Sequence, residues 1–174
     1  GDILHKKGEE QEAFAAYDSC LQWKDDNVMA LNNYAYYLSV KGTDLHKAES
    51  MSYKTIKAEP NNGTYLDTYA WILFMEERYA DAKTYIDQAL KNRDSTADNS
   101  TVIEHAGDIY YMNGMADESV DFWKKAYTGE NQTEVLAWKI KNRQYITGEE
   151  LKKRNASKQK PAATKKSVRK GKKK

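Results

Sequence analysis

The sequence holds a single cysteine, Cys20, among 174 residues, so no disulfide can form within the chain. Prolines are almost as scarce, because Pro60 and Pro161 are the only two, and long helices are free to form over nearly the whole chain. No apolar run approaches the roughly 18 residues of a membrane-spanning helix. Cys20 falls on the apolar side of its predicted helix, and we interpret it as a buried structural thiol.

Signatures of catalysis are also lacking. The sequence has no glycine-rich phosphate loop, no metal-ligand spacing and no nucleophile elbow of a hydrolase. Its histidines, His5, His46 and His105, lie far apart, and paired acids such as Glu76 and Glu77 stand at predicted turns or helix ends. We therefore predict a protein that is not an enzyme and that uses no cofactor and no metal.

What the chain does contain is a unit that recurs every 34 to 37 residues. Each unit has a small residue, a large apolar residue three positions later, a turn, and then Ala or Ser. The leading small residues are Gly1, Ala35, Ala70 and Gly107, which are 34, 35 and 37 residues apart. Periods in this range are typical of stacked two-helix units that bury a continuous core between layers.

Hydrophobic spacing within the units predicts two helices in each. In the third unit, Leu66, Tyr69, Ala70 and Leu73 have the i, i+3, i+4, i+7 spacing of one helical face. The same reading along the chain predicts helices near 1–7, 10–24, 28–41, 44–58, 64–77, 79–92, 101–113, 116–128 and 132–146. The last of these has no partner, so we expect it to cover the exposed end of the stack.

Polar residues at the predicted helix starts are interpreted as caps. Asn-x-Ser/Thr triplets begin at Asn62, Asn99, Asn131 and Asn155. Three of them fall at predicted helix starts, where asparagine is a favoured cap, and glycosylation is the minor alternative. Thr101 followed by Glu104 fits a capping box at the start of another helix.

The repeats resemble those of the tetratricopeptide repeat family over about residues 1–128. The second unit reads ALNNYAYYLSVKG and then KAESMSYKTIKAEPNN, the third YLDTYAWILFMEERYADAKTYIDQAL, and the fourth IEHAGDIYYMNGMADESVDFWKKA. Glu77 replaces the turn glycine of the third unit. The resemblance implies an all-α, right-handed solenoid of antiparallel helix pairs with a C-terminal capping helix. We place the units at about 1–27, 28–62, 63–98 and 99–131, the capping helix at 132–147, and a disordered tail at 148–174.

The resemblance also implies a concave groove lined by the first helix of each unit. In register, the following residues face a ligand: Asn32, Tyr36, Asp67, Trp71, Phe74, Met75, Glu104, Asp108, Tyr111 and Met112. Trp, Tyr and Met are residue types that concentrate binding energy or adapt to a partner. For Trp71 and Tyr111, packing between adjacent repeats is the alternative. The expected function is a non-catalytic scaffold that binds a protein or peptide, and no small-molecule substrate is expected.

The acids at these positions select among partners. Asp67, Glu104 and Asp108 favour a partner that is cationic or rich in backbone amides. They have the wrong sign for a clamp that grips a C-terminal carboxylate, so we do not expect that subclass.

Charge is distributed unevenly along the chain. Residues 148–174 carry twelve Lys or Arg and two Glu, a net charge of +10, whereas the other 147 residues sum to −8. The basic tail gives the alternative function of an adaptor that docks nucleic acid or an anionic membrane, independent of sequence and sensitive to salt. The tail could also lie across the acidic groove and compete with ligands. A further alternative is nuclear import, because KPAATKK with the final lysines resembles a bipartite nuclear import signal. The residues predicted to bind polyanions are Lys152, Lys153, Arg154, Lys165, Lys166, Arg169, Lys170, Lys172, Lys173 and Lys174.

The chain begins inside a repeat unit and lacks an initiating Met. We therefore expect that an upstream part is missing, and a signal peptide cannot be judged. The run YLDTYAW and the EHAGD unit are similar to the C-terminal part of bacterial tetratricopeptide proteins, many of them exported or membrane-attached. The compartment stays unknown, with an exported or periplasmic location left open.

Overall fold

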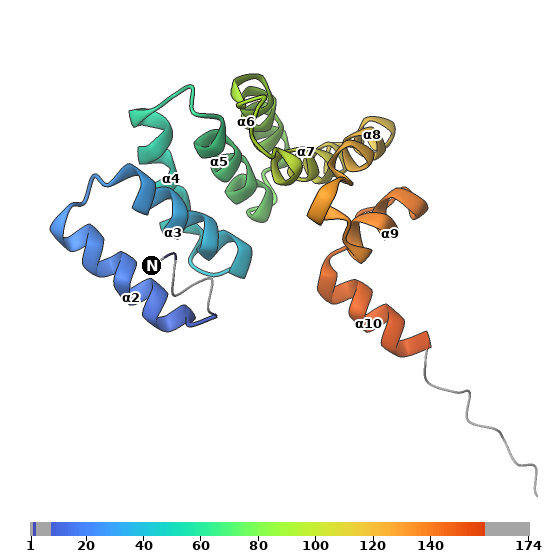
Figure 1. Ribbon diagram of the computed structural model, residues 1–174, viewed down its shortest axis with the longest axis horizontal. Helices are drawn as coiled ribbons and strands as arrows, with labels where there is room; N and C mark the ends of the chain where they lie inside the picture. Colours follow the sequence, from blue (N-terminus) through green and yellow to red (C-terminus); the bar gives the residue numbers. More distant parts are fainter. Residues whose placement is uncertain (1, 3–7, 159–174) are drawn as a thin grey trace, which may run out of the picture.

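A computed structural model of the chain describes residue 2 and residues 8–158, whose helices follow one another along an arch (Figure 1). The elements are α2 (Glu10–Trp23), α3 (Val28–Lys41), α4 (Leu45–Ala58), α5 (Gly63–Met75), α6 (Tyr79–Asn92), α7 (Ser100–Met112), α8 (Ala116–Ala126), the 3-10 turn η1 (Gly129–Asn131), α9 (Glu134–Asn142) and α10 (Gly148–Lys158). No strand occurs among these residues. The predicted helix over 1–7 falls almost wholly outside the described residues.

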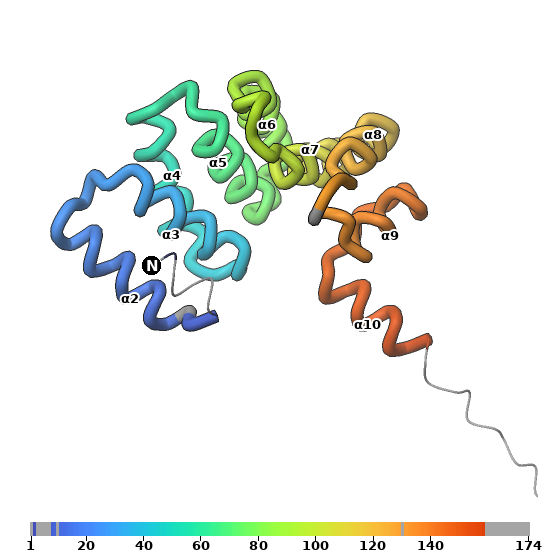
Figure 2. Tube along the Cα trace, viewed as in Figure 1, coloured from blue at the N-terminus to red at the C-terminus, as the bar shows by residue number. Residues whose placement is uncertain are grey.

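Consecutive helices pack as pairs, and the pairs stack. Helix α3 packs on α4, α5 on α6 and α7 on α8, while α3 also contacts α5 and α5 contacts α7. The backbone trace shows α2 and α3 at one end of the arch and α9 and α10 at the other (Figure 2). The prediction of an all-α solenoid of helix pairs is confirmed, and the chain folds as a stack of repeat units.

Local signals in the sequence explain where several helices begin and end. The side chains of Asn27 and Asn62 accept hydrogen bonds from backbone N–H groups at the starts of α3 and α5. Asn99 precedes α7 but makes no such bond, so the cap predicted there is wrong. Gly42 ends α3 in the left-handed conformation with φ of 68°. Glu77 adopts the same conformation, φ of 61°, where the third unit lacks its glycine.

Small residues allow neighbouring helices to approach closely. The side chains of Ala35 and Ala70, which lead two of the units, are completely buried. At the equivalent Gly107, a Cβ atom would lie 2.4 Å from Cδ1 of Trp123, which is itself fully buried. Glycine is therefore required at this position, because the indole of Trp123 occupies the space of a methyl group.

The end of the stack differs from the sequence prediction. The expected capping helix over 132–147 is interrupted: α9 ends at Asn142, and Arg143 adopts a left-handed φ of 54°. The expected disorder from residue 148 is wrong for residues 148–158, which form α10. Thr147 and Glu150 cap this helix reciprocally, with backbone-to-side-chain distances of 2.9 and 3.2 Å, and Leu151 is buried.

Two further predictions concern the burial of Cys20 and the absence of a membrane-spanning helix. Cys20 was expected to be buried, but it is half-buried beside the core cluster around Tyr17 and Leu31. None of the described helices has both the length and the apolar content needed to cross a bilayer.

Candidate functional site

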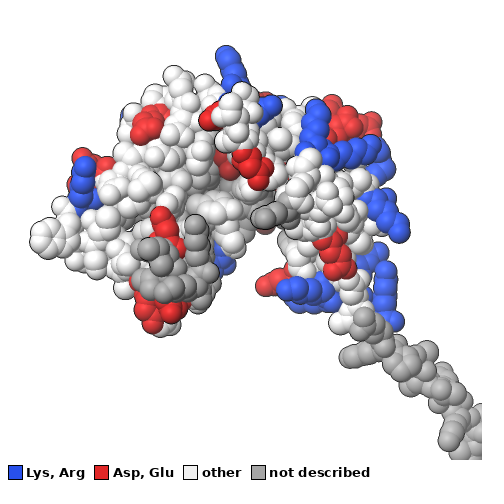
Figure 3. Space-filling model, viewed as in Figure 1, with Lys and Arg blue, Asp and Glu red and all other residues white. Residues whose placement is uncertain are grey.

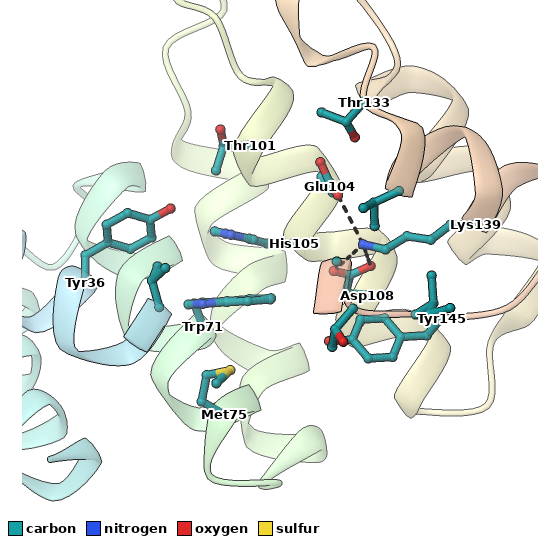
Figure 4. Close-up of a pocket in the computed structure, with 15 residues that line it drawn as sticks. Tyr36, Trp71, Met75, Thr101, Glu104, His105, Asp108, Thr133, Lys139 and Tyr145 are labelled. Atoms are coloured by element: carbon teal, nitrogen blue, oxygen red, sulfur yellow. Dashed lines mark hydrogen bonds and ion pairs between the residues drawn. The ribbon is translucent and has the colours of Figure 1, made fainter. Parts of the chain in front are cut away.

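The inner side of the arch holds a cavity of about 480 Å³. Its walls come from α3, α5 and α7, which are the first helices of three successive units, and from the segment after α8 (Figure 4). The lining residues are Tyr36 and Val40 of α3, Trp71 and Met75 of α5, Thr101, Glu104, His105 and Asp108 of α7, and Thr133, Val135, Lys139, Tyr145, Ile146, Thr147 and Gly148. We call this cavity the concave pocket. It is an open groove that the chain's own C-terminal segment closes at one end.

The register of the repeats places five predicted ligand-facing residues in the concave pocket. These are Tyr36, Trp71, Met75, Glu104 and Asp108. They come from three successive units, which the stacking of α3, α5 and α7 brings to one surface.

The other five predicted residues do not line it. Asn32 is 4% exposed, Asp67 6% and Phe74 5%, so these three side chains are buried, as is that of Asp108, which does border the pocket. Tyr111 is half-buried and lies against Trp123 of its own unit and against Tyr145 of the C-terminal segment. Met112 is partly buried against the central core.

Stacked rings form one wall of the pocket. The indole of Trp71 stacks on the imidazole of His105, with ring centroids 4.1 Å apart, and on the ring of Phe74 at 4.8 Å. Two neighbours therefore cover much of the indole face. Tyr36 lies beside the same stack, 6.4 Å from His105. Burial, together with nearby Asp67, raises the pKa of Tyr36 to about 12, so its phenol stays neutral and can donate a hydrogen bond.

A buried ion pair includes one member of this stack. Nδ1 of His105 is 2.9 Å from Oδ1 of Asp67, and both side chains are almost fully buried. Burial alone would lower the pKa of His105, but the Asp67 carboxylate, with Asp108 and Glu104, outweighs burial and raises the pKa. Asp67 thus holds the imidazole of His105 against the indole of Trp71.

A second charged cluster joins α7 to the capping helix. The ammonium of Lys139 lies 2.7 and 2.8 Å from the two carboxylate oxygens of Asp108 and 3.1 Å from Glu104. Asp108 also accepts a hydrogen bond from Nε1 of Trp123 at 2.8 Å. Burial raises the pKa of Asp108, and Lys139 offsets part of that effect.

Glu104 does not form the predicted capping box with Thr101. Its carboxylate instead contacts Lys139 through one oxygen and accepts from the Asn131 amide, 3.2 Å away, through the other. The Asn131 side chain, predicted as a helix cap, therefore holds a residue of the pocket.

Sequence reasoning missed His105, Lys139 and the 145–148 segment. The sixth position of a first helix, occupied by His105, was not among those assigned to the groove. Lys139 lies on the capping helix, which was expected only to cover the exposed end of the stack, so none of its residues was assigned to the groove. Lys139 pairs with Glu104, 35 positions away, and His105 pairs with Asp67, 38 positions away. No local pattern in the sequence indicates contacts over such separations.

One group of side chains outside the pocket has ligand atoms close enough for a metal ion. The candidate ligand atoms of His46, Glu49 and Glu76 lie within 4.8 Å of one another. Arg78 donates to Glu49 at 2.6 Å and to Glu76 at 3.2 Å. A guanidinium at the centre of this group neutralises the carboxylates and opposes a second cation, so we interpret it as an ion-pair network.

The basic residues of the predicted tail fall in two places. Lys152, Lys153 and Arg154 lie exposed on α10, and Arg154 lies over the ring of Trp138 at 5.2 Å. The other seven predicted polyanion-binding residues, beginning with Lys165, lie outside the described residues. In the space-filling view, basic side chains gather around α8 to α10 and acidic ones are scattered over the arch (Figure 3).

Part of the chain is similar in sequence to a known repeat protein. No protein-family model matches the sequence. A TPR repeat-containing protein of Pseudomonas aeruginosa is 36% identical over 66 residues, which are 38% of this chain and 11% of that relative. The chain therefore matches only about a tenth of the length of this curated relative.

Solved structures give the same answer for the fold. The crystal structure of MamA superposes with a TM-score of 0.62 at 17% identity, covering 82% of this chain and 81% of MamA. YrrB, described as a TPR protein with an unusual peptide-binding site, gives 0.59 at 14% identity, with 72% and 62% covered. A tetratricopeptide repeat protein from Parabacteroides merdae gives 0.52 at 20%, with 82% and 68% covered. The chain therefore has the helical-repeat fold of these tetratricopeptide repeat structures.

Proposed function

We propose that this chain is a non-catalytic interaction scaffold that binds an extended segment of a protein partner in the concave pocket. The observation that carries the proposal is the pocket itself. Its volume of about 480 Å³ lies within the range of roughly 300–1,000 Å³ that is usual for ligand sites. Aromatic and aliphatic walls with a few convergent polar groups are the composition of such sites.

The fold supports this proposal. Solenoids of stacked helix pairs present extended concave surfaces, and these surfaces are where such proteins bind partners. YrrB, which shares the fold, has a peptide-binding site according to its description. Each basic side chain of the concave pocket is engaged with a carboxylate, in the pairs Asp67–His105 and Asp108–Lys139, which favours a binding role over an acid–base one.

The test is selection of peptides on the immobilised full chain from a random-peptide phage library. Affinities of the selected peptides would then be measured by fluorescence anisotropy. Val40 lies at the pocket and is 56% exposed, so Val40→Trp would fill the entrance without disturbing the core. We expect this variant to weaken binding at least about tenfold, because a bulky side chain in the pocket displaces the anchor residue of the ligand.

Met29→Trp is the matched control. Met29 is on the same helix, α3, is 62% exposed and does not line the pocket. Binding should survive this change. Selected peptides that bind equally well to the Val40→Trp variant would show that the pocket is not the binding site.

A further inference from the structure

We propose that the concave pocket selects a partner segment by a lysine or arginine side chain, inserted between its aliphatic walls and paired with Glu104. This inference rests on the proposed function and names the chemistry of its ligand. It is argued from the hydrogen-bonding capacity of the charged groups in the pocket, from their net charge and from the shape of the walls.

The cation already present in the pocket has no capacity left for an anionic ligand. An ammonium group has three N–H donors. Lys139 has three close carboxylate oxygens, two from Asp108 and one from Glu104, at 2.7, 2.8 and 3.1 Å. Its side chain is 4% exposed. A partner carboxylate would have to break one of these bonds and would meet Glu104 and Asp108 at close range.

The other basic group is similarly engaged. His105 directs Nδ1 to Asp67 and is 7% exposed where it stacks on Trp71. Among the described lining residues, His105 and Lys139 are the only basic side chains. Lys139 is not free to receive an anion, and an anion at the second ring nitrogen of His105, Nε2, would meet the carboxylates of Asp67, Asp108 and Glu104 that already act on this ring.

The acceptors, by contrast, are partly open. The side chain of Glu104 is 20% exposed, five times more than that of Lys139 or Asp108. Each carboxylate oxygen has more than one lone pair, so Glu104 can keep Lys139 and Asn131 and still accept from a ligand. Thr101 and Thr133 lie on the same side of the pocket as Glu104 (Figure 4) and add hydroxyl acceptors.

Charge counting points in the same direction. The cluster contains three carboxylates, from Asp67, Glu104 and Asp108, against Lys139 and His105. It therefore carries a net charge of −1 when His105 is protonated and −2 when it is neutral. Residues 1–147 together carry a charge of −8, so the surrounding field also attracts a basic segment.

The walls suit the stem of a long basic side chain. Val40, Met75, Val135 and Ile146 line the pocket beside the polar cluster. Lysine and arginine bury their methylene stems on apolar surface while the charged head reaches a polar partner. The phenol of Tyr36 adds an electron-rich ring at the rim, where cations are also favoured.

The experiment uses the full chain and a set of blocked pentapeptides, Ala-Leu-X-Leu-Ala, in which X is arginine, lysine, methionine or glutamate. Dissociation constants would be measured by fluorescence anisotropy in 150 mM salt. We expect the arginine and lysine peptides to bind at least about tenfold more tightly than the other two, the scale of one charge-assisted hydrogen bond in a partly buried site.

Glu104→Gln keeps an oxygen for Lys139 but removes the negative charge, so it should abolish the preference for basic peptides. Glu118→Gln is the matched control, because Glu118 is exposed in the first turn of α8, away from the pocket, and makes the same change of charge. Equal affinity for the methionine peptide, or a preference that survives Glu104→Gln, would overturn this inference while leaving peptide binding intact. Failure of all four peptides and of the library selection would overturn both proposals.

The chain's own basic residues are the competing occupant. Residues 159–174 carry eight Lys or Arg and no acid. A full-length variant with these eight bases changed to glutamine separates the two cases. Unchanged affinity for the arginine peptide supports a foreign partner. A gain of more than about tenfold at low salt, where exposed charges are least screened, would show that the tail fills the pocket and would overturn the proposal.

Discussion

The ammonium of Lys139 lies 2.7 Å from Asp108, although the two residues are 31 positions apart and sit on different units of the stack. Both side chains are 4% exposed. The pair joins α9 to α7 at the point where the solenoid ends, and the segment that follows α9 then forms a side of the concave pocket. This buried charge pair and the apolar contacts of Leu136 with Trp123 therefore both hold the end of the groove.

Lys139→Met should destabilise the chain by about 3–5 kcal/mol, because it leaves Asp108 charged, buried and without its main partner. Urea unfolding followed by circular dichroism would measure the loss. Lys141→Met, on the exposed side of the same helix, should change the free energy of unfolding by less than about 0.5 kcal/mol.

The double variant Lys139→Met/Asp108→Asn separates charge from packing. The amide of asparagine can still accept from Trp123 but carries no charge, so most of the lost stability should return. A double variant as unstable as the single one would mean that the unpaired charge of Asp108 is not what destabilises the Lys139→Met variant.

Stability should fall as pH rises from about 6.5 through the folded-state pKa of His105. The pKa of His105 is raised in the folded chain because, despite burial, the carboxylates of Asp67, Asp108 and Glu104 favour the protonated ring. The folded state therefore holds this proton more tightly than the unfolded state. The stabilisation is fully present below the unfolded-state pKa and is lost above the folded-state pKa.

The measurement is a series of urea unfolding curves from pH 6 to pH 9. His105→Asn should be less stable at pH 6 and should lose most of the decline with pH. His46→Asn, at an exposed site, should behave as the unchanged chain does. A decline of the same size in the His105→Asn variant would assign it to other groups.

Much of the fold could be predicted from the sequence because the same helical pattern recurs in each repeat unit. Each unit carries its own helical spacing, and the small residues Ala35 and Ala70 mark the same buried position twice. The repeat register also brings Tyr36 and Trp71 to one surface, where both line the concave pocket; that they bind a partner there stays a prediction.

The C-terminal part was harder because composition and local signals disagreed. The segment after Gly148 is rich in lysine and poor in apolar residues, which suggested disorder. Thr147 and Glu150 nevertheless form a capping box, and Leu151 supplies a single buried anchor. The pairs Lys139–Asp108 and His105–Asp67 were beyond prediction, since each depends on how units pack and not on spacing within one unit.

Glu77→Gly should stabilise the chain by about 1 kcal/mol, because Glu77 has a φ of 61°, where only glycine avoids a steric penalty. Thermal unfolding would show a higher midpoint. Gly114 has the equivalent place in the next unit, with a φ of 78°, so Gly114→Ala should cost a similar amount. No gain from Glu77→Gly would mean that contacts of the glutamate compensate for its backbone.

Gly107→Ala tests why the fourth unit leads with glycine when two others lead with alanine. Alanine is the better helix former, by about 1 kcal/mol in an exposed helix. At Gly107, however, the added methyl would meet the fully buried indole of Trp123 at 2.4 Å. Overpacking of this kind costs about 1–3 kcal/mol, so we expect a net loss of stability in urea unfolding.

Trp123→Ala provides the second arm of a double-mutant cycle. It removes the whole indole, including the atoms Cδ1 and Nε1 that an alanine methyl would meet, and also the hydrogen bond to Asp108. Gly107→Ala should therefore cost clearly less in the Trp123→Ala background than in the unchanged chain, a coupling of about 1 kcal/mol or more. Additive effects would show that the indole moves aside at little cost, and that glycine at this position serves another purpose than making room for Trp123.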